Sequence, residues 1–368
     1  MVVKARRRTR NRVATTDHSE LVLGILYRMG GATVDQVASL MRHADPGRWS
    51  THSAAYEAAK KTCRVLRENG YAEAVGLRRP WAGRTEGRPE SFHRLRKGGE
   101  GQVEGAIAAG APGDKASINY RRIWSGGGVA HAAMRVDYVL SLLDGAEAAG
   151  VDVDPDRTWS ESHPSYPLVG SKLAPADAAG RKIKAKVTAR RIYERVVPDG
   201  ECEIDFGGDV CPVYFEVERR TQSSVVADKI ERYAGRWGRV LKDDGVLEAR
   251  PVIVVHHDAR RAQRANPKAG AGAPALASAL ETLLSSGQGQ GHFASLQTEF
   301  LRRDEYASLG RMILVCSWDD VAAHGAHAPI YYPVSTYNEE GDAVLPVDLR
   351  MAAEERVVLM RGYSKAVR

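Results

Sequence analysis

The segment VYFEVERR, residues 213–220, places two carboxylates on one face of a predicted strand. Alternate side chains of a strand share a face, so Glu216 and Glu218 lie roughly 7 Å apart at about 3.3 Å rise per residue. Like charges this close raise each other's pKa and cost stability. Solvent, a basic neighbour or a metal ion must therefore compensate them.

A metal site is one solution, because a third acid precedes this strand. Asp199 follows Pro198 at the end of an earlier predicted strand, and the hairpin after it returns to Glu216. Ligands that are all oxygen suit Mg²⁺ or Mn²⁺, and such an ion activates water for phosphodiester hydrolysis. We expect Asp199 and Glu216 to hold the ion, with Glu218 as a third candidate carboxylate.

These acids, and the basic residues Lys229 and His131, also have a structural interpretation. Residues 198–200 (PDG) are all turn formers and could make an ordinary turn. Lys229 could be a surface residue of its predicted helix, residues 224–241, and His131 could be structural. The two glutamates could lie on the solvent face of an edge strand, paired with Arg219, Arg220 or Arg232.

Positive charge is concentrated in the first hundred residues. Residues 1–100 contain 20 Lys and Arg against 10 Asp and Glu, whereas the remaining residues contain 33 against 36. This asymmetry predicts that the N-terminal part contacts a polyanion, most simply DNA. Alternatively, the basic stretch at residues 1–12 only solubilises the chain.

The N-terminal hundred residues show the element order of a winged helix-turn-helix. Helical spacing predicts helices at 20–29, at 34–42 after a Thr33 cap and at 53–69 after a Ser53 cap, followed by strands at 71–75 and 91–95. In that fold the third helix enters the major groove and the hairpin tip contacts the DNA backbone or minor groove. The predicted DNA contacts are Lys60, Lys61, Arg64 and Arg67 on the helix, and Arg78, Arg79, Arg84 and Arg88 at the tip. Alternatively, these are solvated charges on a winged helix that binds protein.

The remainder of the chain has a mixed α/β order. Small residues at 105–118 predict a linker, and a long helix is expected at 129–149. Strands are expected at 157–160, 191–198, 201–206, 210–218, 251–256 and 312–316. Gly207, Gly208 and Asp209 predict a tight hairpin turn between the third and fourth of these strands.

Bulk composition points to a cytoplasmic protein. The four cysteines form no CxxC pair, which argues against a zinc site and a disulfide framework. No run of 18 apolar residues appears, so no membrane span or membrane partner is expected. The basic N-terminus (KARRRTRNR) is not followed by an apolar segment, so no signal peptide is expected.

The acidic motifs resemble the core of the PD-(D/E)xK nucleases. The resemblance rests on PDG, a hairpin, FEVER, and a helix with Lys and Tyr. It implies that Asp199 and Glu216 bind the metal and that a lysine two residues later orients the attacking water. Glu218 stands where that lysine is expected. Some members carry the lysine on the following helix, and Lys229 matches that arrangement. By this resemblance Lys229 would support the nucleophile, and Glu218 would join the ion or bind its water.

Residues 18–325 also resemble the replication-relaxation family of actinobacterial plasmids and mobile elements. The matching motifs are LRENGY, FHRLRKGGE, VAHAAMRVDYVLSLL, TWSES, VVPDG, FEVERRTQSS and KIERYAGRW. The resemblance implies a role in plasmid replication, DNA relaxation or conjugative transfer, and makes Glu161 a further metal ligand. DNA is the expected partner, with a second copy of the chain or replication and transfer proteins as further candidates.

Two other functions stay open at this point. The nuclease-like domain could be a scaffold in a replication or transcription factor, as Glu218 in place of lysine favours, or the chain could be a protein-binding adaptor. The sequence predicts a basic disordered tail (1–17), a winged helix-turn-helix (18–104), a linker (105–118), a nuclease-like α/β domain (119–325) and a C-terminal extension (326–368).

Overall fold

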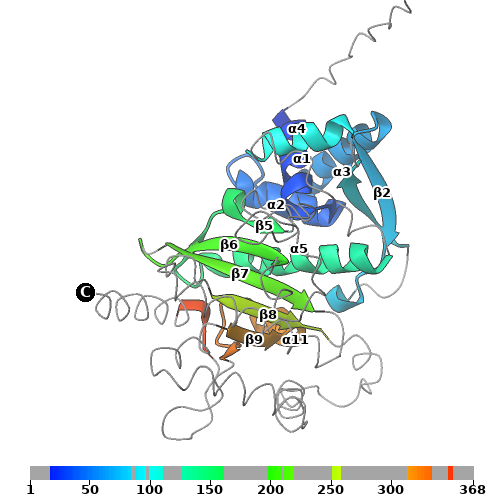
Figure 1. Cartoon of the computed structure of the whole chain (residues 1–368). Coiled ribbons are helices and arrows are strands. Elements are labelled where there is room, and N and C mark those ends of the chain that lie inside the picture. Colours follow the sequence, from blue (N-terminus) through cyan, green and yellow to red (C-terminus); the bar gives the residue numbers. More distant parts are fainter. Residues whose placement is uncertain are drawn as a thin grey trace, which may run out of the picture.

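The computed structural model of the 368-residue chain is a mixed α/β structure (Figure 1). It describes residues 17–83, 88–96, 99–110, 126–160, 198–208, 210–218, 251–257, 313–333 and 347–350. Four predicted segments lie wholly or mostly outside these ranges: the basic tail except Asp17, most of the linker, the strand expected at 191–198 except its last residue, and the helix expected at 224–241.

Three helices begin the described chain: α1 (Asp17–Met29), α2 (Val34–Ala44) and α3 (His52–Glu68). They confirm the three helices predicted there. Thr33 caps α2 in a capping box, because its hydroxyl accepts the Gln36 N–H at 3.2 Å while Gln36 Oε1 accepts the Thr33 N–H at 2.9 Å. The cap predicted for α3 was wrong: Thr51, which is extended, accepts the Ala54 N–H, and Ser53 lies inside the helix.

A small antiparallel sheet completes this region in the order β1-β3-β2. Its strands are β1 (Ala32–Thr33), β2 (Ala72–Leu77) and β3 (Glu90–Leu95), and a short 3₁₀ helix η1 (Pro80–Ala82) lies in the connection from β2 to β3. β1 pairs with β3 through Ala32 and His93, so β3 is the central strand. The strand β3 therefore has neighbours on both sides, and its residues are largely buried.

A fourth helix, α4 (Glu100–Ala108), extends into the range predicted as a linker. Its glycines permit close packing. A Cβ on Gly105 would lie 2.5 Å from Leu95 Cδ1 and 3.1 Å from the Leu23 carbonyl oxygen, and a Cβ on Gly24 of α1 would lie 3.2 Å from the Ala108 carbonyl oxygen. The small residues that predicted a linker thus allow α4 to approach α1 and β3.

The larger sheet has seven described strands. The path runs β10-β9-β8-β7-β6-β4, and β5 also pairs with β6. Pairing is parallel between β7 and β8 and between β8 and β9, and antiparallel elsewhere. The bounds are β4 (Asp152–Val153), β5 (Trp159–Ser160), β6 (Gly200–Asp205), β7 (Val210–Glu218), β8 (Val252–His256), β9 (Ile313–Ser317) and β10 (Tyr332–Pro333).

Further short elements flank this sheet. A 3₁₀ helix, η4 (Pro155–Arg157), precedes β5, and α11 (Trp318–His324) follows β9. Strand β10 and the buried Tyr331 lie beyond residue 325, where the predicted α/β domain ends. The sheet therefore includes part of the range assigned to the C-terminal extension.

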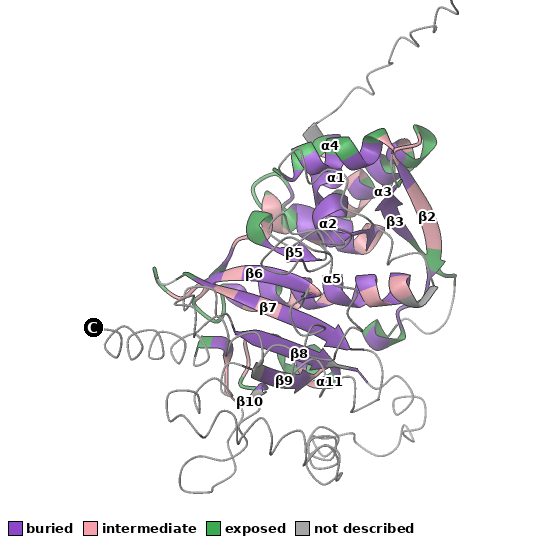
Figure 2. Ribbon diagram, viewed as in Figure 1, coloured by how far each residue is buried: buried purple, intermediate pink, exposed green. Residues whose placement is uncertain are grey.

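The long helix α5 (Gly126–Ala146) joins the two regions. It contacts α2 and β1 as well as β4, β5 and β7, and Figure 1 shows it between the N-terminal helices and the large sheet. Tyr138 packs edge-on against Phe215 of β7 with ring centroids 5.3 Å apart. Both residues are fully buried, and Figure 2 shows buried colouring along much of α5 and the central strands. One core therefore runs from the small region into the sheet.

None of the helices in the described residues has the length and apolar character needed to cross a membrane. All four cysteines are free and buried, and the sequence had predicted no disulfide framework. Burial raises the pKa of the Cys63 thiol to about 12, so this cysteine is a packing residue.

Candidate nucleic-acid interface

The exposed face of α3 carries the cations that the sequence singled out. Ala55, Ala59, Cys63 and Leu66 are buried and hold the helix against the core. Four residues between or next to them on the helix surface are exposed cations: Lys60, Lys61, Arg64 and Arg67. The amphipathic spacing of α3 thus fixes both which side packs and where the charges lie.

These four cations line a groove of about 950 Å³ between α3, the start of α2 and the first residues of β3. Arg88, which precedes β3 and is exposed, lines the same groove from the other side. The structure therefore brings together five of the eight cations predicted to bind DNA. They come from segments about twenty or more residues apart in the chain.

The groove also has three acidic residues, and all three have basic partners. Glu57 pairs with Lys60 at 3.4 Å, on the exposed surface. Asp35 and Glu90 are both held by Arg79, at 3.1 and 2.8 Å. The charge left for an incoming ligand is consequently positive, because part of the negative charge is compensated from beneath the groove.

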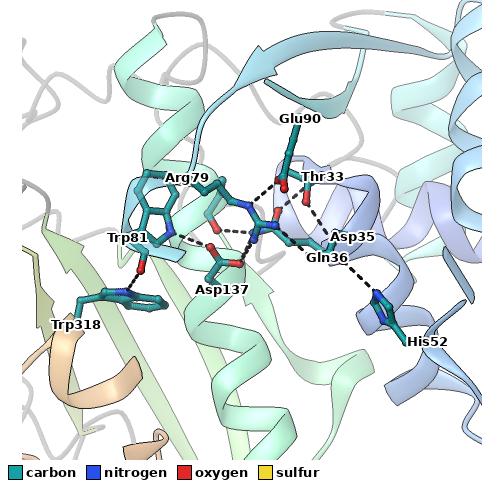
Figure 3. A network of polar contacts seen from close by, with 10 residues as sticks. Thr33, Asp35, Gln36, His52, Arg79, Trp81, Glu90, Asp137 and Trp318 are labelled. Atoms are coloured by element: carbon teal, nitrogen blue, oxygen red, sulfur yellow. Dashed lines mark hydrogen bonds and ion pairs between the residues drawn. The ribbon is translucent and has the colours of Figure 1, made fainter. Parts of the chain in front are cut away.

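Arg79, predicted at the hairpin tip as a DNA contact, lies instead in the interior and is 3% exposed. Figure 3 shows its guanidinium at the centre of a network of carboxylates. Besides the bonds to Asp35 and Glu90, its Nη1 atom donates to Asp137 Oδ1 at 2.7 Å. With all three guanidinium nitrogens bonded to carboxylates, Arg79 is placed to hold the protein together rather than to touch a ligand.

Asp137 comes from α5 and is the innermost acid of this network. It also accepts hydrogen bonds from Gln36 Nε2 at 2.7 Å and from Trp81 Nε1 at 2.8 Å (Figure 3). Burial alone would lower the pKa of Arg79, but Asp137, Glu90 and Asp35 together raise it above its ordinary value. Burial raises the pKa of Asp137, against the opposing effect of Arg79, Gln36 and Trp81.

The same network ties the connection between β2 and β3 to the large sheet. Trp318, at the start of α11, donates its indole N–H to the Trp81 carbonyl oxygen at 3.0 Å. Gln36 also donates to the Ala133 carbonyl oxygen of α5 at 2.7 Å. The residues beneath the groove are therefore hydrogen-bonded to both α5 and α11.

The other hairpin arginines divide between the surface and the undescribed part of the chain. Arg78 is exposed next to the buried Arg79. It does not line the groove. Arg84 lies outside the described residues.

The second predicted site is centred on Asp199, just before β6. Its Oδ2 atom accepts the Val217 N–H at 3.0 Å and lies 3.1 Å from His131 Nε2. Arg135 Nη1 lies 3.5 Å from the other carboxylate oxygen, and His131 Nε2 also lies 2.6 Å from the Val217 carbonyl oxygen. The Asp199 carboxylate thus joins α5 to β7 and is compensated by protein donors.

Glu216 and Glu218 are 3% and 9% exposed. Their strand, β7, lies between β6 and β8, so the interpretation that they form the solvent face of an edge strand is wrong. Phe215 and Val217 alternate with them and are buried, and Phe215 faces α5. By alternation the two glutamates point to the sheet face opposite α5.

Among the described residues, no group of three or more His, Cys, Asp and Glu side chains is arranged to hold a metal ion. Glu161 and Lys229, which the family resemblances add to the site, lie outside those residues. The part of the predicted site that can be seen therefore consists of Asp199 beside β7, with Glu216 preceding the residue it binds.

Three residues of these sites escaped the sequence analysis. Asp137 is one acid in an apolar helical run, VDYVLSLL, and that isolation is the signal that could have marked it as a buried partner. His93 is buried on the central strand β3 and lines the groove. Arg135 is buried next to Asp199, although a charged side chain on a long helix is ordinarily read as exposed.

Comparisons with known proteins add no relative to these observations: no family model, no curated protein and no solved structure matches the chain. The functional argument therefore depends on the residues and geometry described above.

Proposed function

We propose that the chain is a DNA-binding protein whose N-terminal region grips duplex DNA as a winged helix-turn-helix. The observation that carries this proposal is the groove lined by Lys60, Lys61, Arg64, Arg67 and Arg88. Arginine and lysine on one face supply the charge that neutralises phosphates, which is the main source of affinity for DNA.

The order of elements supports a winged helix. Helix, short strand, two helices and two strands follow one another, and the small sheet has the order β1-β3-β2. In such a fold α3 would lie in the major groove and the β2–β3 connection would reach the DNA backbone. Arg79 is left out of the proposed contacts because it is buried, whereas exposed Arg78 and undescribed Arg84 remain in the proposal.

The test is the salt dependence of binding by the full chain to a labelled duplex of about 20 base pairs. Each phosphate contact contributes about −0.9 to the slope of log affinity against log salt, so Arg64→Ala/Arg67→Ala should reduce its magnitude by about 2. Arg42→Ala/Arg96→Ala is the matched control, since both arginines are exposed and lie outside the groove. Lack of binding at low salt, or equal slopes for both double variants, would refute the proposal.

A divalent-metal-dependent DNA endonuclease or nickase is the second candidate function. It is favoured by one observation: Asp199 binds the backbone of β7 at Val217, next to Glu216. The described residues do not by themselves fit Mg²⁺ or Mn²⁺, because His131, Arg135 and the Val217 amide already compensate Asp199. We therefore derive no catalytic step through a metal ion.

A nicking assay separates the enzyme from a DNA-binding scaffold. Supercoiled plasmid is incubated with the full chain and Mn²⁺, and Asp199→Ala serves as the variant. Metal-dependent nicking that the variant loses would support the endonuclease, whereas equal nicking by both proteins would remove Asp199 from the site. Cleavage of no DNA form would favour the non-catalytic replication or transcription factor.

The biological setting is proposed from the replication-relaxation resemblance. On this proposal the chain acts in the replication, relaxation or conjugative transfer of a plasmid or mobile element, and its cysteine usage favours the cytoplasm. Candidate partners besides DNA are a second copy of the chain and other replication or transfer proteins.

A further inference from the structure

A histidine lies at the base of the basic groove. His93 belongs to β3 and is 3% exposed, yet it is one of the residues that line the groove. Its Nδ1 atom is buried and makes no hydrogen bond with the described part of the chain. Buried polar atoms in folded proteins nearly always have a partner, so an unsatisfied nitrogen beside an open cationic groove needs a physical explanation.

The surroundings of His93 combine uncharged strand neighbours with one nearby cation. Its neighbours across the small sheet, Ala32 and Ala74, are uncharged. Burial and, as the smaller cause, the positive charge of Arg67 on α3 together lower the pKa of His93 to about 4. An anion between Arg67 and His93 would oppose the second cause directly and would favour a protonated ring.

The remaining charged groups around the groove also favour an anion. On α3, Lys61 adds positive charge, and Lys60 and Arg64 are paired with the exposed Glu57 and Glu68. At the start of α2 and on β3, Asp35 and Glu90 are bonded to Arg79, and Arg88 is exposed. Among the described residues that line the groove, each acid already forms an ion pair with a lysine or with Arg79, and none of these ion pairs involves His93.

We infer that a phosphate group binds at the base of this groove between Arg67 and His93, and that His93 donates a hydrogen bond to it. The inference rests on the proposed DNA binding only for the source of the phosphate, which would be the DNA backbone. A free phosphate offers the same chemistry and is distinguished by the experiment below.

Binding of this kind must be linked to proton uptake. A bound anion raises the pKa of His93, so the complex holds a proton that the free protein does not hold above about pH 4. Affinity should consequently increase as the pH falls from 7 to 5, by roughly tenfold if the bound ring titrates near pH 6.

The experiment measures duplex affinity of the full chain between pH 7 and pH 5 at constant salt, for the wild type, His93→Gln and His52→Gln. His52 is the matched control, because it is an exposed histidine on α3 that pairs with Asp35. The inference predicts a roughly tenfold increase for the wild type and His52→Gln, and a flat profile for His93→Gln. An unchanged pH dependence in His93→Gln would overturn it while leaving DNA binding intact.

A second measurement needs no variant. Nitrogen chemical shifts of His93 in the wild-type chain are recorded while inorganic phosphate, and separately the duplex, is added. A response to both supports a DNA-backbone phosphate, and a response to inorganic phosphate without duplex binding supports a free-phosphate site and contradicts the proposed function. No response to either ligand would overturn the inference.

Discussion

On the exposed side of the N-terminal region, Lys61 and Arg64 line the groove, and the acid beside Arg64 is the exposed Glu68, at 3.9 Å. Directly beneath, Arg79 is 3% exposed and bonded to Asp35, Glu90 and Asp137. All three are basic residues. The difference shows that a basic side chain marks a ligand surface only where the protein does not itself neutralise it, and neutralisation cannot be judged from residue type alone.

The largest expected effect concerns Arg79. Replacing it by Ala leaves three carboxylates near each other without their common cation, two of them part-buried and Asp137 deeper still. We expect the free energy of unfolding to fall by about 3–5 kcal/mol in urea denaturation. Arg78→Ala, at the exposed neighbouring position, should change it by less than about 0.5 kcal/mol. Equal effects of the two variants would abolish the distinction between the groove and the network.

The next effect is a pH dependence of stability due to His93. Its folded-state pKa of about 4 lies below its ordinary value of 6.5, so the unfolded chain binds a proton first as the pH falls. Stability from this residue is present above about pH 6.5 and is lost towards pH 4, with a limit of about 3 kcal/mol.

Urea denaturation at several pH values checks this prediction, with His93→Gln as the variant. The difference in unfolding free energy between the variant and the wild type should itself depend on pH over this interval. A constant difference would mean that His93 is as easily protonated in the folded chain as in the unfolded one.

A smaller effect is expected for Trp81→Phe. The substitution removes the indole donor of the 2.8 Å bond to Asp137 and keeps an aromatic ring in place. We expect a loss of about 1–3 kcal/mol in the free energy of unfolding, because a buried carboxylate loses one of its donors. Arg79→Ala should reduce this loss, since residues of one network are not additive.

The smallest effect on stability is predicted for the groove itself. Lys61 is exposed and has no ion pair in the described part of the chain, so Lys61→Ala should change the free energy of unfolding by less than about 0.5 kcal/mol. Duplex affinity should nevertheless fall, with one phosphate contact fewer in the salt slope. A destabilised Lys61→Ala with unchanged affinity would reverse the assignment of the two regions.

Elements with strong local signals were predictable from the sequence. The helix at Val34–Ala44 and its cap were predicted correctly because Thr33 and Gln36 interact over three residues. The hairpin of β6 and β7 was predicted correctly from Gly207 and Gly208, which have φ of 84° and 104°. By contrast, α4 was missed because Gly101 and Gly105 indicate a loop unless their close packing partners are known.

The sites were less predictable, because their chemistry depends on distant partners. Arg79 meets Asp137 only after 58 residues and Asp35 across 44 residues, so its burial could not be read from the RRPW motif. Asp199 lies next to β7, and its binding to His131 and Arg135 depends on a helix more than sixty residues earlier. Cations on α3 were predictable since helical spacing alone separates them from the buried side.

The most direct test of the central claim is hydrogen–deuterium exchange of the full chain with and without a saturating duplex at low salt. The account predicts slower exchange on α3 and at residues 88–93, next to the groove, and unchanged exchange in β7–β9. Protection confined to the large sheet, with none along α3, would contradict the assignment of the groove as the DNA-binding surface.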